Sequence, residues 1–326
     1  MKENKPWYIK FADAVQKLID AAGIPMHASK FSKKTVNLHQ HIMIQVYKEK
    51  KRSLTYRGLR EQLEESKLAD YIGLKCAPHF TTPQKFAKRI KAYDLEKIIQ
   101  SIGKVVKLDD IIAGIDSTGF SMDHASHHYA KRIGRKKPVK GFVKFSGAAN
   151  LRKGQGYFLG VRIRKRPAHD NKDFIPLANK ASRQGKLKRV NADKAHDCGD
   201  NHDHVVEKLG AECIIPLRRH TDSRSRIKNK YRKRLFDYFP KRKYNKRNNV
   251  EANIGSVKQK TGSVLRARKF RTQKISVLSK IISHNVDVFL KNKRIFNWLG
   301  FTKPDASRSK EISILRKIMA LMHVCF

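Results

Sequence analysis

The chain has 326 residues, enough for one large domain or two ordinary ones, and it contains no run of 18 apolar residues and no apolar signal segment at its N-terminus. We therefore expect a cytoplasmic protein with no membrane span. With 73 Lys and Arg against 28 Asp and Glu, the formal net charge is +45. The Lys and Arg residues are spread along the chain, which favours a nucleic acid over an anionic membrane surface as the partner. The four cysteines form no CxxC pair, which excludes a disulfide framework.

Residues 1–105 have a helical pattern. The segment 53–66 carries apolar residues three and four apart, which is helical spacing. Thr82 and Pro83 predict the cap and the first position of a further helix, which is basic away from its apolar side. Short helices that end in a basic one are typical of a DNA-binding domain of the helix-turn-helix kind. A helical packing domain with a solvated basic face fits the same pattern equally well.

Residues 106–291 change to a pattern of strands and helices. Strand-like runs occur at 111–117, 141–149, 157–166, 188–193 and 212–218. Helical runs occur at 201–209, 244–260 and 274–291. This order predicts an α/β domain with a mixed sheet. Residues 292–326 form a tail, and its last part, 311–326, has the pattern of an apolar-faced helix.

The densest basic stretch is 218–247. A purely charged run of this length would predict disorder, but aromatic and apolar residues interrupt it from Leu235 to Phe239. We therefore expect a packed segment with a charged exterior.

Two acids follow strand-like runs. Asp116 follows IIAGI, and Asp193 follows another short run 77 residues later. An acid at the carboxyl end of a strand points into the crevice where α/β proteins bind ligands, although each acid alone also fits a turn. Clustered carboxylates of this kind hold the divalent cations that phosphodiester chemistry requires.

A third acid belongs to a polar row on a predicted helix. Spaced three, four and seven residues apart, the members of the row share an arc of about 60°: Tyr244, Arg247, Glu251 and Lys258. The adjoining stripe is apolar and is predicted to be buried: Val250, Ile254 and Val257. The simpler alternative is a solvated face that carries Arg247 and Glu251 as an ordinary i,i+4 ion pair.

These motifs together resemble insertion-sequence transposases of the DDE type. The branch with a Tyr–Arg–Glu–Lys signature shows Y-(2)-R-(3)-E-(6)-K, which is the spacing found at 244–258. DSTG at 116–119 resembles the family's first acidic motif, and ADKAHD at 192–197 resembles its second. One departure is His196, which stands where the family usually has an aromatic residue, most often Tyr.

The resemblance implies an RNase H-like catalytic domain at 106–291, a mixed sheet flanked by helices, preceded by a small all-α domain at 1–105. It implies a metal-binding and catalytic triad for two Mg²⁺ (or Mn²⁺) ions: Asp116, Asp193 and Glu251. It also implies three residues that hold DNA beside the scissile phosphate: Tyr244, Arg247 and Lys258. The expected activity is binding of the element's ends, strand cleavage and transfer into target DNA, by a homodimer associated with the nucleoid.

Two other functions fit parts of the pattern. An inactive relative could bind DNA without cutting it and regulate its own element, but acids at all three positions argue against it, because they repel phosphate. A basic structural or ribosome-associated protein would explain the charge of +45 but not the polar row on one helix.

Overall fold

The computed structural model describes residues 5–31, 35–52, 54–122, 132, 134, 141–165, 169–218 and 223–298, with the side chains of 293–298 left out. By its internal contacts the chain divides into two units, Met1–Phe289 and Leu290–Phe326. The sheet and the helices that position the candidate site belong to the first unit. Most of the expected tail, including the helix predicted at 311–326, lies outside the described residues.

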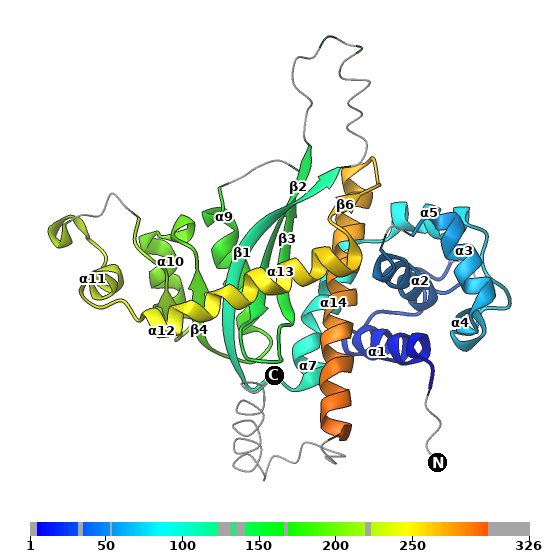
Figure 1. Cartoon of the computed structure of the whole chain (residues 1–326), viewed down its shortest axis with the longest axis horizontal. Helices are drawn as coiled ribbons and strands as arrows, with labels where there is room; N and C mark the ends of the chain where they lie inside the picture. The colour runs from blue at the N-terminus through cyan, green and yellow to red at the C-terminus, as the bar shows by residue number, and fades with distance from the viewer. Residues whose placement is uncertain are drawn as a thin grey trace, which may run out of the picture. The chain divides into compact units, whose positions relative to one another are not determined.

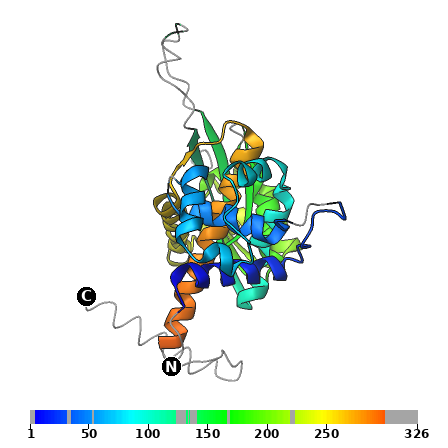
Figure 2. The ribbon, with the colours of Figure 1, turned by 90° about the vertical axis from the view of Figure 1, so that its right-hand side faces the viewer.

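The first unit begins with short helices, as the sequence predicts. They are α1 (Trp7–Ala21), α2 (Leu38–Lys50), α3 (Tyr56–Glu65), α4 (Leu68–Tyr71), α5 (Thr81–Arg89), α6 (Ala92–Gln100) and α7 (Ile102–Val106). Figure 2 views the molecule from the side where α1–α5 face the reader. At the start of α2, Asn37 and Gln40 form a capping box, which satisfies two backbone N–H groups that the helix leaves unpaired.

The predicted start of α5 is wrong. The helix begins at Thr81 with Phe80 as its N-cap, and no side-chain hydrogen bond caps it. Pro83 is therefore the third helical residue rather than the first. Its missing N–H costs nothing there, because the first four N–H groups of a helix have no partner within it.

A mixed sheet lies at the centre of the first unit. Over the described residues it has six strands: β1 (Asp110–Met122), β2 (Phe142–Asn150), β3 (Phe158–Arg164), β4 (Lys186–Ala192), β5 (Glu212–Ile214) and β6 (Val264–Leu265). Their order is β3-β2-β1-β4-β5, and β6 pairs with the end of β1. β1, β2 and β3 are antiparallel, whereas β4 and β5 run parallel to β1 (Figure 1).

Two strands differ most in length from the sequence prediction. β1 does not end at residue 117 but continues to Met122, because β2 pairs with it as far as Ser121. β5 does not reach residue 218 but ends at Ile214. The backbone N–H of Arg218 donates instead to the side chain of Asp197, so this end of the segment leaves the sheet.

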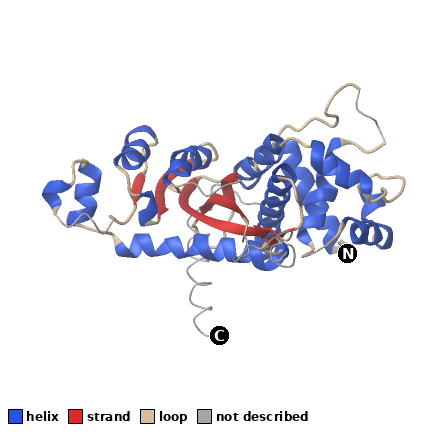
Figure 3. Ribbon diagram, turned by 90° about the horizontal axis from the view of Figure 1, so that it is seen from above, coloured by secondary structure: helices blue, strands red, loops and turns tan. Residues whose placement is uncertain are grey.

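Helices cover both faces of the sheet. The α-helices that follow β3 in the chain are α9 (Asn171–Ser182), α10 (Gly199–Asp203), α11 (Lys230–Asp237), α12 (Lys241–Tyr244), α13 (Asn248–Thr261) and α14 (Phe270–Trp298). α13 lies along one face and α9 lies on the other (Figures 1 and 3). The apolar side of α14 is fully buried at Ile275, Leu278, Ile282 and Val286, as its helical spacing predicts. This mixed sheet between helices is an RNase H-like α/β fold, as expected.

Among the described residues, no helix is both long and apolar enough to cross a membrane.

Candidate active site

The pairing of β1 with β4 brings the first two predicted acids together. The parallel register aligns Ile115 with Ala192, which is the last residue of β4. Asp116 and Asp193 are the residues that follow this pair in the two segments. Because paired strands lie about 4.8 Å apart, the two acids are close neighbours. The sequence predicts Asp116 at the end of its own strand, but β1 continues past it to Met122. Asp116 lies where β4 stops, so one edge of β1 opens beside it.

Each of these acids has one carboxylate oxygen fixed by the backbone. The N–H of Ser117 donates to Asp116 Oδ1 at 2.9 Å, and the N–H of Lys194 donates to Asp193 Oδ1 at 2.7 Å. Among the described residues, Oδ2 of both acids has no hydrogen-bond partner. The carboxylates are thus held in place while one oxygen of each stays available.

The third acid lies on α13, which crosses β1. The predicted buried stripe is confirmed, since Val250, Ile254 and Val257 are at most 7% exposed. Glu251 is exposed, with 54% of its side chain accessible, and its Oε1 accepts a hydrogen bond from Arg247 Nη1 at 2.7 Å. The Arg247–Glu251 ion pair that the simpler alternative predicts is therefore present. It lies on the side of the helix that also faces Asp116 and Asp193.

The helix predicted at 244–260 is not regular at its start. Tyr244 ends α12, a 3-10 turn covers Asn245–Arg247, and α13 begins at Asn248. The backbone stays helical through these joints, with φ −66° at Tyr244 and −58° at Arg247. A 3-10 turn is tighter than an α-turn, so Tyr244 is rotated relative to the arc that a uniform helix would give.

Lys258 is fixed against β1. Its Nζ donates to Thr118 Oγ1 at 2.6 Å and lies 5.7 Å from the centre of the Phe120 ring. Burial lowers the pKa of Lys258. Thr118 belongs to the DSTG motif, so this contact joins the first acidic motif to the last member of the polar row.

The charges of the site act on one another. Burial raises the pKa of Asp116, and the negative charges of Glu251 and Asp193 raise it further against the opposing Ser117 N–H and Arg247 charge. Burial also raises the pKa of Tyr244, with contributions from the same three acids. The three predicted acids, together with Tyr244 and Arg247, therefore form one electrostatically coupled group.

The chemistry of this group fits hard divalent cations. Three carboxylates provide the oxygen ligands that Mg²⁺ prefers, and their mutual repulsion favours a cation between them. Among the described residues, however, no three His, Cys, Asp or Glu side chains converge as a ready metal site. Glu251 is instead paired with Arg247, so its carboxylate has to turn from that partner to join the two aspartates.

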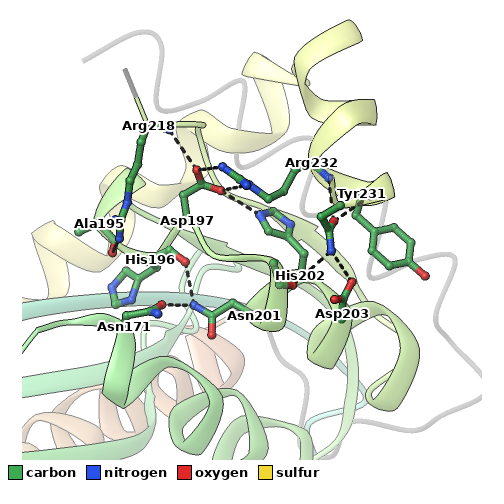
Figure 4. Close-up of polar contacts among 12 residues, drawn as sticks. Asn171, Ala195, His196, Asp197, Asn201, His202, Asp203, Arg218, Tyr231 and Arg232 are labelled. Atoms are coloured by element: carbon green, nitrogen blue, oxygen red, sulfur yellow. Dashed lines mark hydrogen bonds and ion pairs between the residues drawn. The ribbon is translucent and has the colours of Figure 1, made fainter. Parts of the chain in front are cut away.

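A second polar cluster holds the loop that carries Asp193. The side chain of Asp197 is fully buried, and both of its oxygens bind the guanidinium of Arg232 on α11, at 2.8 and 2.7 Å. Figure 4 shows this fork, with His202 on the other side of the carboxylate at 3.5 Å. Burial would raise the pKa of Asp197, but the nearby His202 ring and the hydrogen bonds from Arg232 and the Arg218 backbone hold it below its usual value.

This cluster joins the basic segment 218–247 to residues 193–203, which carry Asp193 and Asp197. Asn229 caps α11 and donates to Asp203 Oδ1 at 2.6 Å, and the Arg218 side chain donates to the carbonyl of Ala195 at 3.0 Å. The segment is thus anchored at several points by polar contacts. The prediction that its aromatic residues pack is wrong for Phe236 and Tyr238, which are 40% and 76% exposed, and α11 has no buried residue. No spacing pattern in the sequence links Asp197 to Arg232.

His196 takes the position where the family usually has an aromatic residue. Its ring is 1% exposed and lies 5.5 Å from the ring of Phe174 on α9. Burial lowers its pKa to about 4. The imidazole therefore fills an aromatic packing position as a neutral ring.

A third set of polar residues supports the DSTG motif from behind. Ser117 Oγ donates to Ser146 Oγ, which donates to Asp173 Oδ2, each at 2.9 Å. Asp173 is completely buried at the start of α9 and is paired with Arg162 and Arg164. Sequence reasoning missed this acid, because nothing in its neighbourhood marks it as buried.

Comparison with known families agrees with this geometry. The family model described as a transposase DDE domain matches residues 107–286, more than half of the chain, including the acids on β1, after β4 and on α13. The chain therefore belongs to the transposase DDE domain family. Members of this family are transposases and generally use divalent metal ions. No curated protein matches the chain.

Proposed function

We propose that this protein is an active transposase of the branch with the Tyr–Arg–Glu–Lys signature. It would bind the ends of its own insertion sequence, cut them and join them to target DNA. The observation that supports this best is the meeting of Asp116 and Asp193 at the end of β4, with Glu251 close enough to raise the pKa of Asp116.

Each residue would have the role that its side-chain chemistry allows. Asp116, Asp193 and Glu251 would hold the Mg²⁺ or Mn²⁺ ions. When bound, such ions lower the pKa of an attacking hydroxyl and stabilise the charge on the leaving oxygen. The Arg247 guanidinium can fork onto a phosphate, and Lys258 offers a fixed point charge. Tyr244 can hydrogen-bond or stack beside them.

The reaction would consist of two phosphoryl transfers. Water first hydrolyses a phosphodiester at the end of the element and frees a 3′-OH. This hydroxyl then attacks a phosphodiester of the target, forms the new bond and displaces the target's own 3′ oxygen. Both steps depend on positioning and on charge stabilisation. Because two ends must be joined, we propose a homodimer in the active complex, acting at the nucleoid.

The test is cleavage of duplex DNA that carries the sequences flanking the gene, with Mg²⁺ or Mn²⁺. Wild type should cut at the flanks. Asp116→Asn, Asp193→Asn and Glu251→Gln should each reduce cutting by more than the roughly 10- to 100-fold loss typical of outer-shell partners. All three variants should still shift the duplex in a gel.

The matched control is Asp200→Asn, which removes an exposed acid from the first turn of α10 and should cut like wild type. Full activity in any of the three variants would remove that residue from the metal-binding role. Wild-type protein that binds the flanks without cutting them would instead favour an inactive regulator of the element.

A further inference from the structure

A basic groove lies between the N-terminal helices and the segment that follows α13. Its volume is about 710 Å³. One wall comes from α2, α3 and α5 and the residues that join them, and the other from 261–280. Figure 1 shows the end of α13 and β6 beside this group of helices. The groove is separate from the carboxylate site, since none of the three acids lines it.

The lining of the groove is strongly positive. It contains eight Lys and Arg residues and one acid, Glu49. That acid is buried and neutralised within the protein, because Lys48 lies 3.0 Å from it and Lys280 lies 3.4 Å from it. The exposed cations at the rim form no ion pair among the described residues: Arg52, Lys88, Arg268 and Lys269. The groove thus presents positive charge that the protein itself does not neutralise.

The floor of the groove is rigidly built. Lys280 is 4% exposed at its side chain, and its ammonium donates to the carbonyls of Thr261 and Gly262 at the end of α13. Gly262 has φ +85°, a backbone conformation that favours glycine, and it lets the chain turn toward α14. Lys280 also lies 3.4 Å from Glu49 on α2, so this buried ion pair joins the two walls of the groove.

The position of the groove relates it to the active site. Both lie along α13, with Glu251 near one end of the helix and Thr261 at the other. Ten residues of α-helix span roughly 15 Å, which equals the rise of about four to five base pairs of duplex DNA. Lys258, fixed against β1, lies between the two sites. Lys258 thus places one positive charge between the acids and the groove.

We propose that this groove binds the sugar–phosphate backbone of the same duplex whose phosphodiester is cut, about four to five base pairs from the scissile bond. The proposal rests on the proposed function, because it takes the three acids as the cutting site. Duplex fits better than single-stranded DNA, which proteins usually bind with stacked aromatic side chains. The aromatic residue in the lining, Tyr56, is instead engaged under Lys48 and with Gln45.

The first experiment measures DNA affinity as a function of salt with EDTA present, so that no cutting occurs. The probe is a fluorescent duplex of about 40 base pairs carrying the flanking DNA. The variant combines Arg52→Gln, Arg268→Gln and Lys269→Gln. Loss of three phosphate contacts should reduce the slope of log affinity against log salt by about 2.7. The charge-matched control combines Lys17→Gln, Lys75→Gln and Lys91→Gln, exposed residues outside the groove, and should keep the wild-type slope.

A second variant adds repulsion without removing a cation. Ser263 is exposed in the groove lining, so Ser263→Glu should weaken duplex binding, whereas Ser263→Gln should not. Hydroxyl-radical footprinting of the wild-type complex should show a protected patch four to five base pairs from the cleavage position, and this patch should disappear in the triple variant. An unchanged salt slope, or a footprint that keeps the patch, would overturn the proposal.

The two proposals can fail separately. If wild type does not cut DNA but the groove variant loses salt-dependent affinity, the groove is a DNA site and the cutting function is wrong. If wild type cuts and the groove variant binds and cuts with unchanged affinity, the active site stands and the groove proposal is wrong.

Discussion

Asp197 is the residue on which the geometry of the second acid most depends. It closes the short 3-10 turn Lys194–His196, and Asp193 opens the same turn. Arg232 therefore fixes, through Asp197, the turn that presents a candidate metal ligand. A buried carboxylate with a forked guanidinium partner is strongly oriented, and an amide in its place cannot make both charge-assisted bonds.

We expect Asp197→Asn to reduce DNA cutting at limiting metal and to leave duplex affinity nearly unchanged. The altered turn carries Asp193, the proposed metal ligand, and not the Lys and Arg residues proposed to contact DNA. Loss of the buried pair should also lower the free energy of unfolding by about 3 kcal/mol. Urea unfolding and a metal titration of cutting measure the two effects. If excess metal does not restore part of the cutting, Asp197 has a role in stability alone.

The same segment supplies the control. Arg224 and Asp237 form a forked pair of similar geometry, but both side chains are exposed, at 59% and 45%. Asp237→Asn should therefore change neither unfolding nor the metal requirement measurably, since exposed ion pairs contribute little.

At the scale of single elements, close approach decides one position that the sequence could not reveal. A Cβ on Gly185, just before β4, would lie 2.4 Å from the carbonyl oxygen of Leu108 and 3.1 Å from that of Asp109. Both neighbours are backbone atoms at the start of β1, so they cannot move aside as a flexible side chain could. Glycine here lets β4 enter the sheet beside β1.

We expect Gly185→Ala to lower the free energy of unfolding by about 1–3 kcal/mol, as other overpacked substitutions do. Gly255 lies on the exposed side of α13, and a Cβ added there would meet no atom within 4 Å. Gly255→Ala should raise stability by up to about 1 kcal/mol, because alanine favours a helix. Equal effects of the two substitutions in urea unfolding would contradict this explanation.

The elements show how far a sequence pattern reaches. The apolar stripe of α13 and the buried side of α14 were predictable, because helical spacing alone determines which residues share a face. The length of β1 was not, since it depends on pairing with β2, and neither was the 3-10 turn before α13. Of the site, the spacing of 244–258 identified the polar row, but Arg232, Asp173 and the basic groove depend on contacts between distant segments.

At the scale of the whole molecule, buried neutral histidines make stability depend on pH. Burial lowers the pKa of His284 on α14 to about 4 and does the same for His41 on α2. His284 binds the carbonyl of Gly156 at 3.0 Å, and His41 stacks on Phe86. In each ring, Nδ1 is buried without a hydrogen-bond partner among the described residues. A proton added to the ring to charge it would therefore find no acceptor at Nδ1.

Between the ordinary histidine pKa of 6.5 and a value of about 4, the unfolded chain binds protons that the folded protein does not. The free energy of unfolding should therefore be highest above pH 6.5 and fall as the pH drops toward 4. For His284 the full loss is on the order of 3 kcal/mol. Thermal unfolding from pH 4.5 to 8 measures it, and His284→Gln should flatten the curve. The control, His79→Gln, replaces an exposed ring and should leave its shape unchanged.

Asn285 has a consequence for how the protein behaves at high concentration. Over the described residues, β3 is one of the edge strands of the sheet, and an edge strand can pair with a strand of another molecule. The Asn285 amide accepts from the N–H of Phe158 at 2.8 Å and donates to its carbonyl at 2.9 Å, so it takes the place of a neighbouring strand there. One side chain of α14 thus blocks this part of the edge, and the protein is protected at that point from forming sheet-linked aggregates.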